Sequence, residues 1–369
     1  MIVLIILLLI QILMLCTSFI LSLKTNEKVI RENIFLSNED IPDVIITAKE
    51  SVETISDCIK SLTGLTIRNI YICLDNPLPQ NVIELERIIP DNCYLIQNKD
   101  CGGKINTQIK GVNVSSAHTI LLLDADIRLI NNKRDFEEML LFKRAHSIDF
   151  LCPYSFGINL NSSCWGSISE CDRILRQRVI RSGRDYFGLS NLSGYFLLAD
   201  RKKYIKIARQ SLQDDVIATI NILKNGFKVK TYPKVVCGEL EHTLFYKHLN
   251  QRVRWTVGNI KALPNYFKVF PQTGLIKGCI FLTTPYLWYT SAYVTFASLI
   301  TLIFYFNPLL FILVLAEILL KTLMIIFVSG KKNIIAIFLY AIIWPFFITM
   351  ALILSLPYAL FNWEKASRR

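Results

Sequence analysis

Charged side chains are almost confined to the middle of this 369-residue chain, and their distribution limits what the chain can fold into. Residues 1–23 carry none, and residues 279–369 carry only eight, although the whole chain has 41 Lys and Arg and 29 Asp and Glu. Residues 24–278 carry the rest, at about one residue in four, which is ordinary for a soluble domain. The pattern predicts a soluble middle between two membrane-type ends. It disfavours a purely soluble enzyme, a disordered chain and a collagen-like fibre.

The first 23 residues are long and apolar enough to cross a bilayer. As a helix they would reach about 35 Å, and they lack the positive start and short apolar core of a cleaved signal peptide. Lys24, Lys28 and Arg31 follow directly. Because positive charge marks the cytoplasmic side of membrane segments, we expect a retained anchor with the soluble middle in the cytoplasm. The chain is thus predicted to be an integral protein of a plasma membrane, an inner membrane or an endomembrane.

Three further apolar stretches follow the soluble middle, at about 279–305, 309–328 and 334–360. Trp344-Pro345 indicates a break in the last stretch, because proline interrupts a helix. Three full spans would also place the basic residues of the chain end outside, against the charge rule. The sequence therefore leaves open whether two or three segments cross the membrane here.

One pair of charges lies inside the second of these stretches. Glu317 and Lys321 are four residues apart, so they share a helix face and can form an ion pair. Such a pair neutralises itself between helices, or it belongs to an acceptor or translocation path. The sequence favours the neutralised pair.

The net charge of +12 restricts the partners of the chain. A basic excess can attract nucleic acid, anionic lipid or a phosphorylated substrate. The Lys and Arg residues are scattered and form no nucleic-acid motif, so membrane lipids are expected as partners and nucleic acid is not. Ten cysteines without a CxxC pair or a Cys/His metal spacing fit a reducing compartment better than a disulfide framework.

The soluble middle has the pattern of an α/β domain. Three short apolar runs, at 44–46, 70–74 and 119–123, resemble strands that are buried on both faces. Between the first two runs, the spacing of apolar residues predicts a helix over 52–62. Alternating strands and helices favour a parallel sheet, whose ligands lie at the carboxyl ends of the strands.

Polar residues follow each run. Asp124-Ala125-Asp126 offers hard oxygen ligands for Mg²⁺ or Mn²⁺ bridging to a diphosphate, although such a triplet also occurs in solvated turns. Asp75-Asn76-Pro77 consists of turn formers, and Thr47 to Glu50 by itself is typical of a helix start. Gly102-Gly103-Lys104 precedes another predicted helix and suits close backbone approach with an ammonium on a phosphate.

Two more motifs lie further along the chain. Gln213-Asp214-Asp215 opens a predicted helix, where acidic residues commonly act as caps. The QRVRW sequence at 251–255 precedes the membrane stretches, where a tryptophan can anchor at the interface and an arginine can meet lipid phosphate.

Taken in order, the motifs resemble glycosyltransferase family 2 in its membrane-integrated branch, which includes cellulose, chitin and hyaluronan synthases and the ceramide glucosyltransferases. The resemblance covers about residues 40–260. The matching segments are IITAKE (45–50), LDN (74–76), GGKIN (102–106), DAD (124–126), SGYFLLADRKKY (193–204), QDD (213–215) and QRVRW (251–255).

The resemblance implies an α/β, Rossmann-like GT-A domain with N-terminal and C-terminal transmembrane helices. It also implies sugar transfer from a nucleotide-sugar, usually UDP-linked, with inversion at the anomeric carbon. The implied donor-binding residues are Thr47, Glu50 and Asp75 for uridine, Lys104 for the diphosphate, and Asp124 and Asp126 for the nucleotide and the Mg²⁺ or Mn²⁺ ion. The implied catalytic residue is Asp215 as general base, with Gln251, Arg254 and Trp255 near the diphosphate and acceptor.

Three positions depart from the family pattern. Lys49 replaces a common Asn, Asn76 replaces a common second Asp, and Asp214 replaces the Glu of a Glu-Asp motif. The first Asp of the second motif and the base position are kept. Direct displacement needs only one base for the acceptor hydroxyl and positive charge for the leaving diphosphate, and the residues above supply both.

The sequence therefore predicts a membrane-bound inverting glycosyltransferase that moves a sugar from a UDP-sugar to a membrane lipid or lipid-linked acceptor. A processive polysaccharide synthase with a glycan acceptor is the alternative within the family, and a non-catalytic nucleotide-sugar-binding membrane protein is the alternative outside it. The expected domains are an anchor (1–23), a cytoplasmic catalytic domain (24–262), an interfacial segment (263–278), two or three transmembrane segments (279–361) and a basic tail (362–369).

Overall fold

The protein divides into two compact units that are not continuous in sequence. The computed structural model describes residues 1–25, 35–49, 51–99, 102–130, 132–160, 163–211, 214–268, 270–285, 290–330 and 333–360. One unit, here called the sheet unit, comprises Lys28–Phe156 and Ser190–Leu240. The other, here called the helical unit, comprises Met1–Glu27, Gly157–Leu189 and Glu241–Arg369. Each unit is described by itself.

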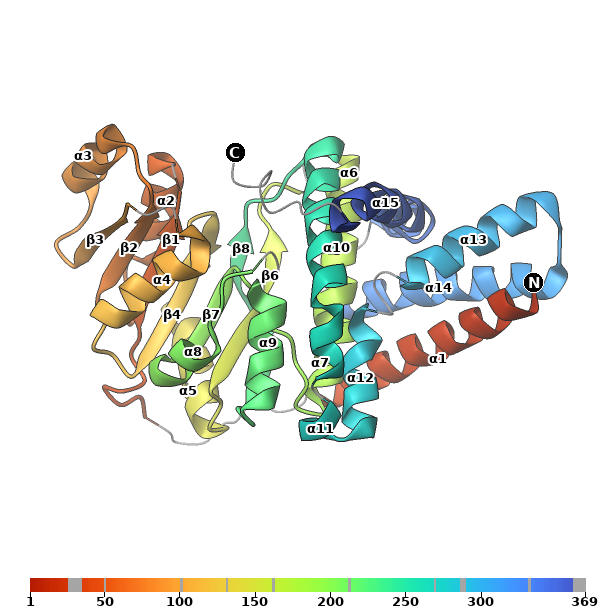
Figure 1. Ribbon diagram of the computed structural model, residues 1–369, viewed down its shortest axis with the longest axis horizontal. Coiled ribbons are helices and arrows are strands. Elements are labelled where there is room, and N and C mark those ends of the chain that lie inside the picture. Colours follow the sequence, from red (N-terminus) through yellow and green to blue (C-terminus); the bar gives the residue numbers. More distant parts are fainter. Residues whose placement is uncertain are drawn as a thin grey trace. The chain divides into compact units, whose positions relative to one another are not determined.

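The sheet unit is organised around one mixed sheet (Figure 1). Among the described residues, its eight strands are β1 (Asp43–Ala48), β2 (Ile70–Asp75), β3 (Cys93–Asn98), β4 (Thr119–Asp124), β5 (Ile127–Leu129), β6 (Phe150–Gly157), β7 (Phe196–Asp200) and β8 (Val229–Glu239). They follow the order β3-β2-β1-β4-β7-β6-β8-β5. The first four in this order are parallel, whereas β7 pairs antiparallel with β4 and β6, and β5 pairs antiparallel with β8.

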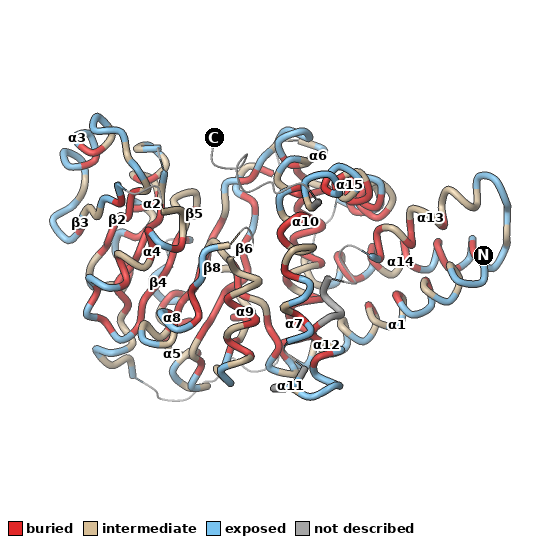
Figure 2. The backbone as a smooth tube through the Cα atoms, viewed as in Figure 1, coloured by how far each residue is buried: buried red, intermediate tan, exposed pale blue. Residues whose placement is uncertain are grey.

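The predicted strands and the predicted helix are confirmed. The three apolar runs form β1, β2 and β4, each buried except at its last residue (Figure 2). The first helix of this unit, α2 (Val52–Leu62), has the predicted bounds, and Ser51 caps it by accepting a hydrogen bond from the Thr54 amide. The other helices of the unit are α3 (Pro79–Ile88), α4 (Gly103–Val114), α5 (Lys133–Ala145), α8 (Arg201–Ile207) and α9 (Asp214–Lys224).

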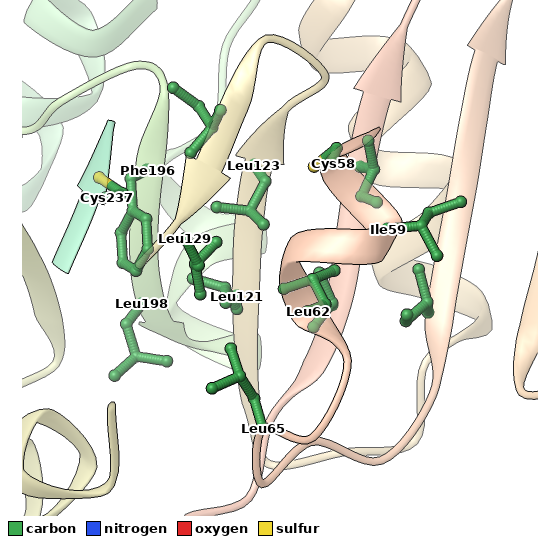
Figure 3. Packing of buried hydrophobic residues seen from close by; sticks show 14 of the residues in the cluster. Cys58, Ile59, Leu62, Leu65, Leu121, Leu123, Leu129, Phe196, Leu198 and Cys237 are labelled. Atoms are coloured by element: carbon green, nitrogen blue, oxygen red, sulfur yellow. The ribbon is translucent and has the colours of Figure 1, made fainter. Parts of the chain in front are cut away.

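Two apolar cores lie on the two faces of the sheet. One joins α2, α3 and α5 to the sheet, and Figure 3 shows Cys58, Ile59 and Leu62 of α2 packing toward strand residues such as Leu121 and Leu123. The other core joins α4, α8 and α9 to the opposite face, where Figure 1 shows these helices in front of the strands. Because apolar burial is the main stabilising contribution, these cores fix the strand ends at which the polar motifs lie.

Gly111 marks the closest approach of α4 to the sheet. A Cβ atom there would overlap Sγ of Cys73 and lie 2.9 Å from Cγ2 of Ile45, and both neighbours are fully buried. Helix propensity alone would favour alanine by about 1 kcal/mol, but overpacking a tight core costs about 1–3 kcal/mol. We therefore expect Gly111→Ala to lower the midpoint of thermal unfolding. Asn113→Ala, on the exposed side of the same helix, is the control and should not lower it; an unchanged midpoint for Gly111→Ala would contradict the close packing.

Among its described residues, the helical unit contains three helices that are long and apolar enough to cross a membrane: Ile2–Thr25, Pro308–Ser329 and Ile334–Ala359. Its helices are α1 (Ile2–Thr25), α6 (Cys164–Ile174), the π-helix η2 (Leu175–Arg181), α7 (Ser182–Asp185), α10 (Phe245–Phe267), α11 (Phe270–Thr273), α12 (Leu275–Pro285), α13 (Ser291–Phe304), α14 (Pro308–Ser329) and α15 (Ile334–Leu360).

The apolar stretch expected at about 279–305 contains the end of α12 and the whole of α13, an apolar helix of 14 residues, and residues 286–289 lie outside the described ones. One expectation about the C-terminal stretches needs correction. The predicted break at Trp344-Pro345 is wrong, since α15 continues through Pro345. Proline is tolerated in an apolar bundle where neighbouring groups satisfy the freed backbone. The basic tail at 362–369 lies outside the described residues.

The ion pair predicted inside the second stretch is confirmed. Lys321 Nζ contacts Glu317 Oε1 on α14, and both side chains are buried. Gln11 of α1 donates to the same Glu317 oxygen, and the hydroxyl of Thr295 on α13 donates to the other oxygen at 2.8 Å. The pair therefore joins three helices through polar contacts in an apolar surrounding.

Candidate active site

The carboxyl ends of the parallel strands bring three of the sequence-predicted residues to one edge of the sheet. Thr47 lies near the end of β1, next to Asp124 in register, and Asp75 ends β2. Thr47 is buried, and within the described ranges its hydroxyl has no hydrogen-bond partner. Glu50, the fourth residue predicted here, lies outside the described residues. The edge is thus the place where a parallel sheet presents a ligand site.

Lys104 joins this edge to the segment before β7. Its Nζ lies 2.6 Å from Oδ1 and 2.7 Å from Oδ2 of Asp124, and it donates to the carbonyl oxygen of Gly194 at 2.6 Å. Burial by itself would lower the pKa of the ammonium. The carboxylates of Asp124, Asp214 and Asp215 outweigh burial, and the pKa of Lys104 lies above its ordinary value. The three carboxylates therefore favour the charged form of Lys104.

Asp75 fixes the start of the helix that carries Lys104. Its Oδ2 accepts a hydrogen bond from the Gly103 amide at 3.2 Å, and its Oδ1 accepts one from Thr107 at 3.1 Å and one from Asn98 Nδ2 at 3.2 Å. An aspartate at a helix N-terminus also interacts favourably with the helix dipole. The sequence placed Gly102-Gly103-Lys104 before a helix. In the structure the helix begins at Gly103, so Lys104 lies in its first turn.

Gln210 is a residue that sequence reasoning missed. Its Oε1 accepts a hydrogen bond from the Ile105 amide at 2.9 Å, so the loop before α9 caps the N-terminus of α4. Gly103 has φ +78°, and a Cβ atom there would lie 2.8 Å from Gln210 Nε2. The positive φ favours a glycine at this position, whereas the end of the Gln210 side chain could shift. No local pattern indicates the contact, because the two partners are far apart in the sequence.

The predicted general base lies beside the same glycine carbonyl. Asp215 is in the first turn of α9, and its Oδ1 accepts a hydrogen bond from the Val216 amide at 2.8 Å. A Cβ atom on Gly194 would lie 3.7 Å from Cβ of Asp215 and 3.8 Å from Nζ of Lys104, so the small residue separates the two side chains. The prediction that Asp214 and Asp215 open a helix is confirmed, while Gln213 lies outside the described residues.

Thr219 holds α9 against this glycine segment. Its hydroxyl donates to the carbonyl of Asp215 at 2.7 Å and accepts from the Leu192 amide at 3.0 Å. The backbone of Asp124 in turn donates to the carbonyl of Tyr195 at 3.0 Å. The segment 193–195 is therefore fixed to both the base helix and the Asp124 strand, and its sequence signal is the SGY of the quoted SGYFLLAD motif.

Asp126 is the carboxylate best suited to hold a metal ion. Its Oδ1 is buried, and no described residue is its hydrogen-bond partner. Burial and the neighbouring carboxylates of Asp124 and Glu239 raise the pKa of Asp126 to about 7. A buried carboxylate oxygen without a hydrogen-bond donor, beside other carboxylates, fits a divalent cation with oxygen ligands. In the described ranges no three His, Cys, Asp or Glu residues form a metal site by themselves, so other ligands would have to come from the substrate.

The other predicted site residues belong to the helical unit, on α10. Arg254 is exposed, and Oε1 of Gln251 is buried with no partner among the residues described. The ring of Trp255 lies under two guanidinium groups, with Arg252 at 4.4 Å and Arg176 at 5.7 Å from its centroid. The structure thus brings Thr47, Asp75, Lys104, Asp124, Asp126 and Asp215 together in the sheet unit and places Gln251, Arg254 and Trp255 together in the helical unit.

Comparison with known proteins agrees with this fold. A mannosyltransferase from Pyrobaculum calidifontis, solved in complex with GDP-Man and Mn²⁺, matches with a TM-score of 0.60 over 96% of this chain and 99% of its own, at 13% sequence identity. At this identity the match shows a shared fold. No curated protein matches the sequence. The family described as "Glycosyl transferase family group 2" matches residues 174–362, about half of the chain, and so the chain belongs to this family of glycosyltransferases.

Proposed function

We propose that this glycosyltransferase moves a sugar from a UDP-sugar to the hydroxyl group of a membrane lipid or lipid-linked acceptor, with inversion at the anomeric carbon. The observation that carries the proposal is the meeting of Lys104, Asp124 and Asp215 around Gly194. It puts one carboxylate that can accept a proton beside one cation that can face a diphosphate. These are the two requirements of a direct displacement.

In this reaction Asp215 acts as the general base. The acceptor oxygen forms a bond to the anomeric carbon while the bond between that carbon and the diphosphate oxygen breaks. The hydroxyl proton passes to the carboxylate of Asp215, and the bonding electrons leave with the nucleoside diphosphate. The Val216 amide holds Oδ1 of Asp215, which orients the carboxylate. The diphosphate leaves without being protonated, so the reaction does not require a catalytic acid beside the base.

Lys104 and the two aspartates of the DAD turn would hold the donor. Lys104 offers a fixed positive charge for the diphosphate, and Asp75 acts by holding the turn in which Lys104 lies. Asp126, with Asp124 beside it, would hold Mg²⁺ or Mn²⁺. Such an ion, when bound, offsets the negative charge that develops on the leaving diphosphate. Thr47, whose hydroxyl is buried and available as a donor, would contact the nucleoside together with Glu50.

Different observations support the proposed class of donor and the proposed class of acceptor. The similar mannosyltransferase binds a nucleotide-sugar, GDP-Man, with Mn²⁺, which supports a nucleotide-sugar and a divalent ion here. The choice of uridine rests on the sequence resemblance. The three helices long enough to cross a membrane support the membrane-integrated branch and a lipid acceptor. The positive residues after the first of them favour a cytoplasmic catalytic domain at 24–262.

A donor screen tests the proposal. The full chain, purified in a neutral detergent with membrane lipid extract and Mn²⁺, is incubated with a panel of UDP-sugars and GDP-sugars, and products are identified by mass. We expect one UDP-sugar to yield a lipid carrying one added sugar. A long glycan would instead indicate a processive synthase. Turnover of a GDP-sugar alone would refute the uridine assignment. If no donor were turned over, the assignment of transferase activity would be refuted.

A UDP titration with the same preparation tests the metal assignment. Asp126→Ala should weaken Mn²⁺-dependent UDP binding by about tenfold or more, because one charged ligand of the ion is lost. Asp91→Ala, at an exposed aspartate in the turn before β3, is the matched control. UDP binding that is equally strong with and without Mn²⁺ would contradict a metal site at Asp126.

A further inference from the structure

A cavity inside the helical unit is lined by both charged and apolar side chains. Its polar walls are Asp172 of α6, Arg176 of η2, Ser291 of α13, Lys321 of α14, and Tyr340 and Trp344 of α15. Apolar residues of α1, η2, α13 and α15 complete the lining. The three described helices that could cross a membrane, α1, α14 and α15, each contribute to it. Ionisable side chains between such helices are costly, so those that line a cavity are candidates for a binding function.

The size of the cavity limits what can enter. Its volume is about 30 Å³, and a water molecule needs about 10–15 Å³ by the same measure, so about two water-sized groups fit. A sugar ring or a nucleoside diphosphate is far larger. The cavity therefore suits a small group that exposes two or so oxygen atoms, attached to something that continues along the apolar walls.

The charges around the cavity favour an anion. Asp172 Oδ2 lies 3.4 Å from Nη2 of Arg252 and 3.8 Å from Nε of Arg176. One negative charge is therefore paired with two positive charges. Lys321 adds a third cation, which Glu317 balances. Burial is the main cause that lowers the pKa of Arg176 to about 10; the Asp172 carboxylate opposes this shift only in part, and the guanidinium groups around Arg176 add to it. An anion near Arg176 would offset this cost.

Trp344 supplies a further donor at the cavity. Its side chain is 5% exposed, and its indole N–H has no acceptor in the part of the chain that the structure describes. A buried donor left without an acceptor costs about 1–3 kcal/mol, and an indole N–H can only donate. The cavity wall thus combines cations with an N–H group, which matches the acceptor oxygens of a phosphate.

The cavity is also connected to the QRVRW motif. Arg176 lines the cavity and lies over the ring of Trp255, and Arg252, which pairs with Asp172, lies over the same ring. Arg176 is carried by η2, a seven-residue π-helix, and π-helical turns are frequent at functional sites. A group bound at Arg176 would therefore lie one side chain away from Trp255 of the motif assigned to the acceptor.

We propose that this cavity binds the phosphate group of a phosphorylated acceptor lipid, whose chain then lies along the apolar helices. The inference rests on the proposed function and specifies the class of its acceptor. Arg176 and the Trp344 indole contact the phosphate oxygens, and the ion-paired Lys321 lines the cavity beside them. Free phosphate presents the same oxygens, but it offers nothing to the apolar lining, so a lipid is favoured.

Calorimetric titration of the full chain in neutral-detergent micelles tests the inference. Dodecyl phosphate should bind at least about tenfold more tightly than either dodecanol in the same micelles or inorganic phosphate. If dodecanol bound as tightly as dodecyl phosphate, the site would not recognise the phosphate charge. If inorganic phosphate bound as tightly, the site would not recognise the alkyl chain. Either result would overturn the proposal.

Two variants locate the binding. Arg176→Gln and Trp344→Phe should each weaken dodecyl phosphate binding by about tenfold or more, because each loses a hydrogen bond to a charged group. Arg134→Gln, at an exposed arginine paired with Glu138, is the control and should bind as the parent does. UDP binding and the elution volume check the fold. Trp344→Phe removes the indole N–H but keeps an apolar aromatic ring, although a smaller one, so it decides the question if Arg176→Gln does not fold.

The outcome is separable from that of the donor screen. If a UDP-sugar is turned over but dodecyl phosphate does not bind, the phosphate site is wrong and the enzyme assignment stands. If dodecyl phosphate binds with the expected variant pattern but no nucleotide-sugar is turned over, the site stands and the proposed reaction is wrong. If Arg176→Gln and Trp344→Phe both bound dodecyl phosphate as tightly as the parent, the proposed phosphate site would be wrong.

Discussion

Asp215→Asn is expected to lower the rate of sugar transfer by about 10²–10⁴-fold while nucleotide binding stays close to that of the parent. The asparagine amide has the shape of the carboxylate, and its oxygen can still accept the hydrogen bond from the Val216 amide. It cannot accept the proton of the attacking hydroxyl, and a positioned general base typically contributes a factor of this size. Initial rates of transfer at saturating donor, together with a UDP titration, measure both quantities.

Asp214→Asn is the matched control for this change. Asp214 precedes the base in the same helical turn, and its Oδ1 accepts a hydrogen bond from the Asp215 amide at 3.2 Å. Replacing Asp214 should lower the transfer rate much less than replacing Asp215, because the change removes a charge near Lys104 and leaves the base in place. An equal loss in both variants would assign the two carboxylates a shared electrostatic role. Unchanged turnover in Asp215→Asn would remove the base from the mechanism.

The parallel half of the sheet could be predicted because its information is local. Strands β1, β2 and β4 are short β-branched or leucine-rich runs that are buried on both faces, and such runs are recognisable without knowing their neighbours. The positions just after them follow from the geometry of parallel sheets. This is why the sequence alone predicts Thr47, Asp75 and Asp124 at one edge.

The antiparallel half could not be predicted in the same way. Strand β8, for example, has buried and half-buried positions in no regular alternation, and it contains Pro233. Its partners are distant in sequence, as are those of β7, which pairs with β4 and β6. Pairing of this kind depends on tertiary packing that overrides local preference.

The connections within the candidate site were hidden for a related reason. The motifs identified Lys104, Asp124 and Asp215 separately, but the atoms that join them are the backbone of Gly194 and the side chain of Gln210. Backbone carbonyls carry no sequence signal, and a lone glutamine in a loop is ordinarily just a solvated polar residue. The sequence therefore predicts the chemical groups of the site, and the fold supplies the contacts that orient them.

Lys104→Met is expected to lower the catalytic efficiency for the donor by about 10²–10³-fold, which is the effect of removing one group that stabilises developing charge. Methionine fills a similar volume but gives no hydrogen bond to Asp124 or to the Gly194 carbonyl. The Asp124 carboxylate, left without its cation, would then repel the donor diphosphate. We therefore expect weaker UDP binding as well as slower transfer, measured by a UDP titration and by initial rates.

A lysine elsewhere separates this effect from a general change in charge. Lys60→Met removes an exposed lysine of α2 that pairs with Asp57 at 3.2 Å, and exposed pairs contribute little, so binding and transfer should stay at the parental level. Lys104→Arg keeps the charge but has a longer, planar head, and partial activity is expected because the two cations are not interchangeable. If Lys104→Met bound UDP as tightly as the parent and lost only thermal stability, Lys104 would be a structural link between α4 and the Gly194 segment. If Lys104→Met lost both UDP binding and transfer rate, and Lys104→Arg recovered part of each, the donor would need a positive charge at this position.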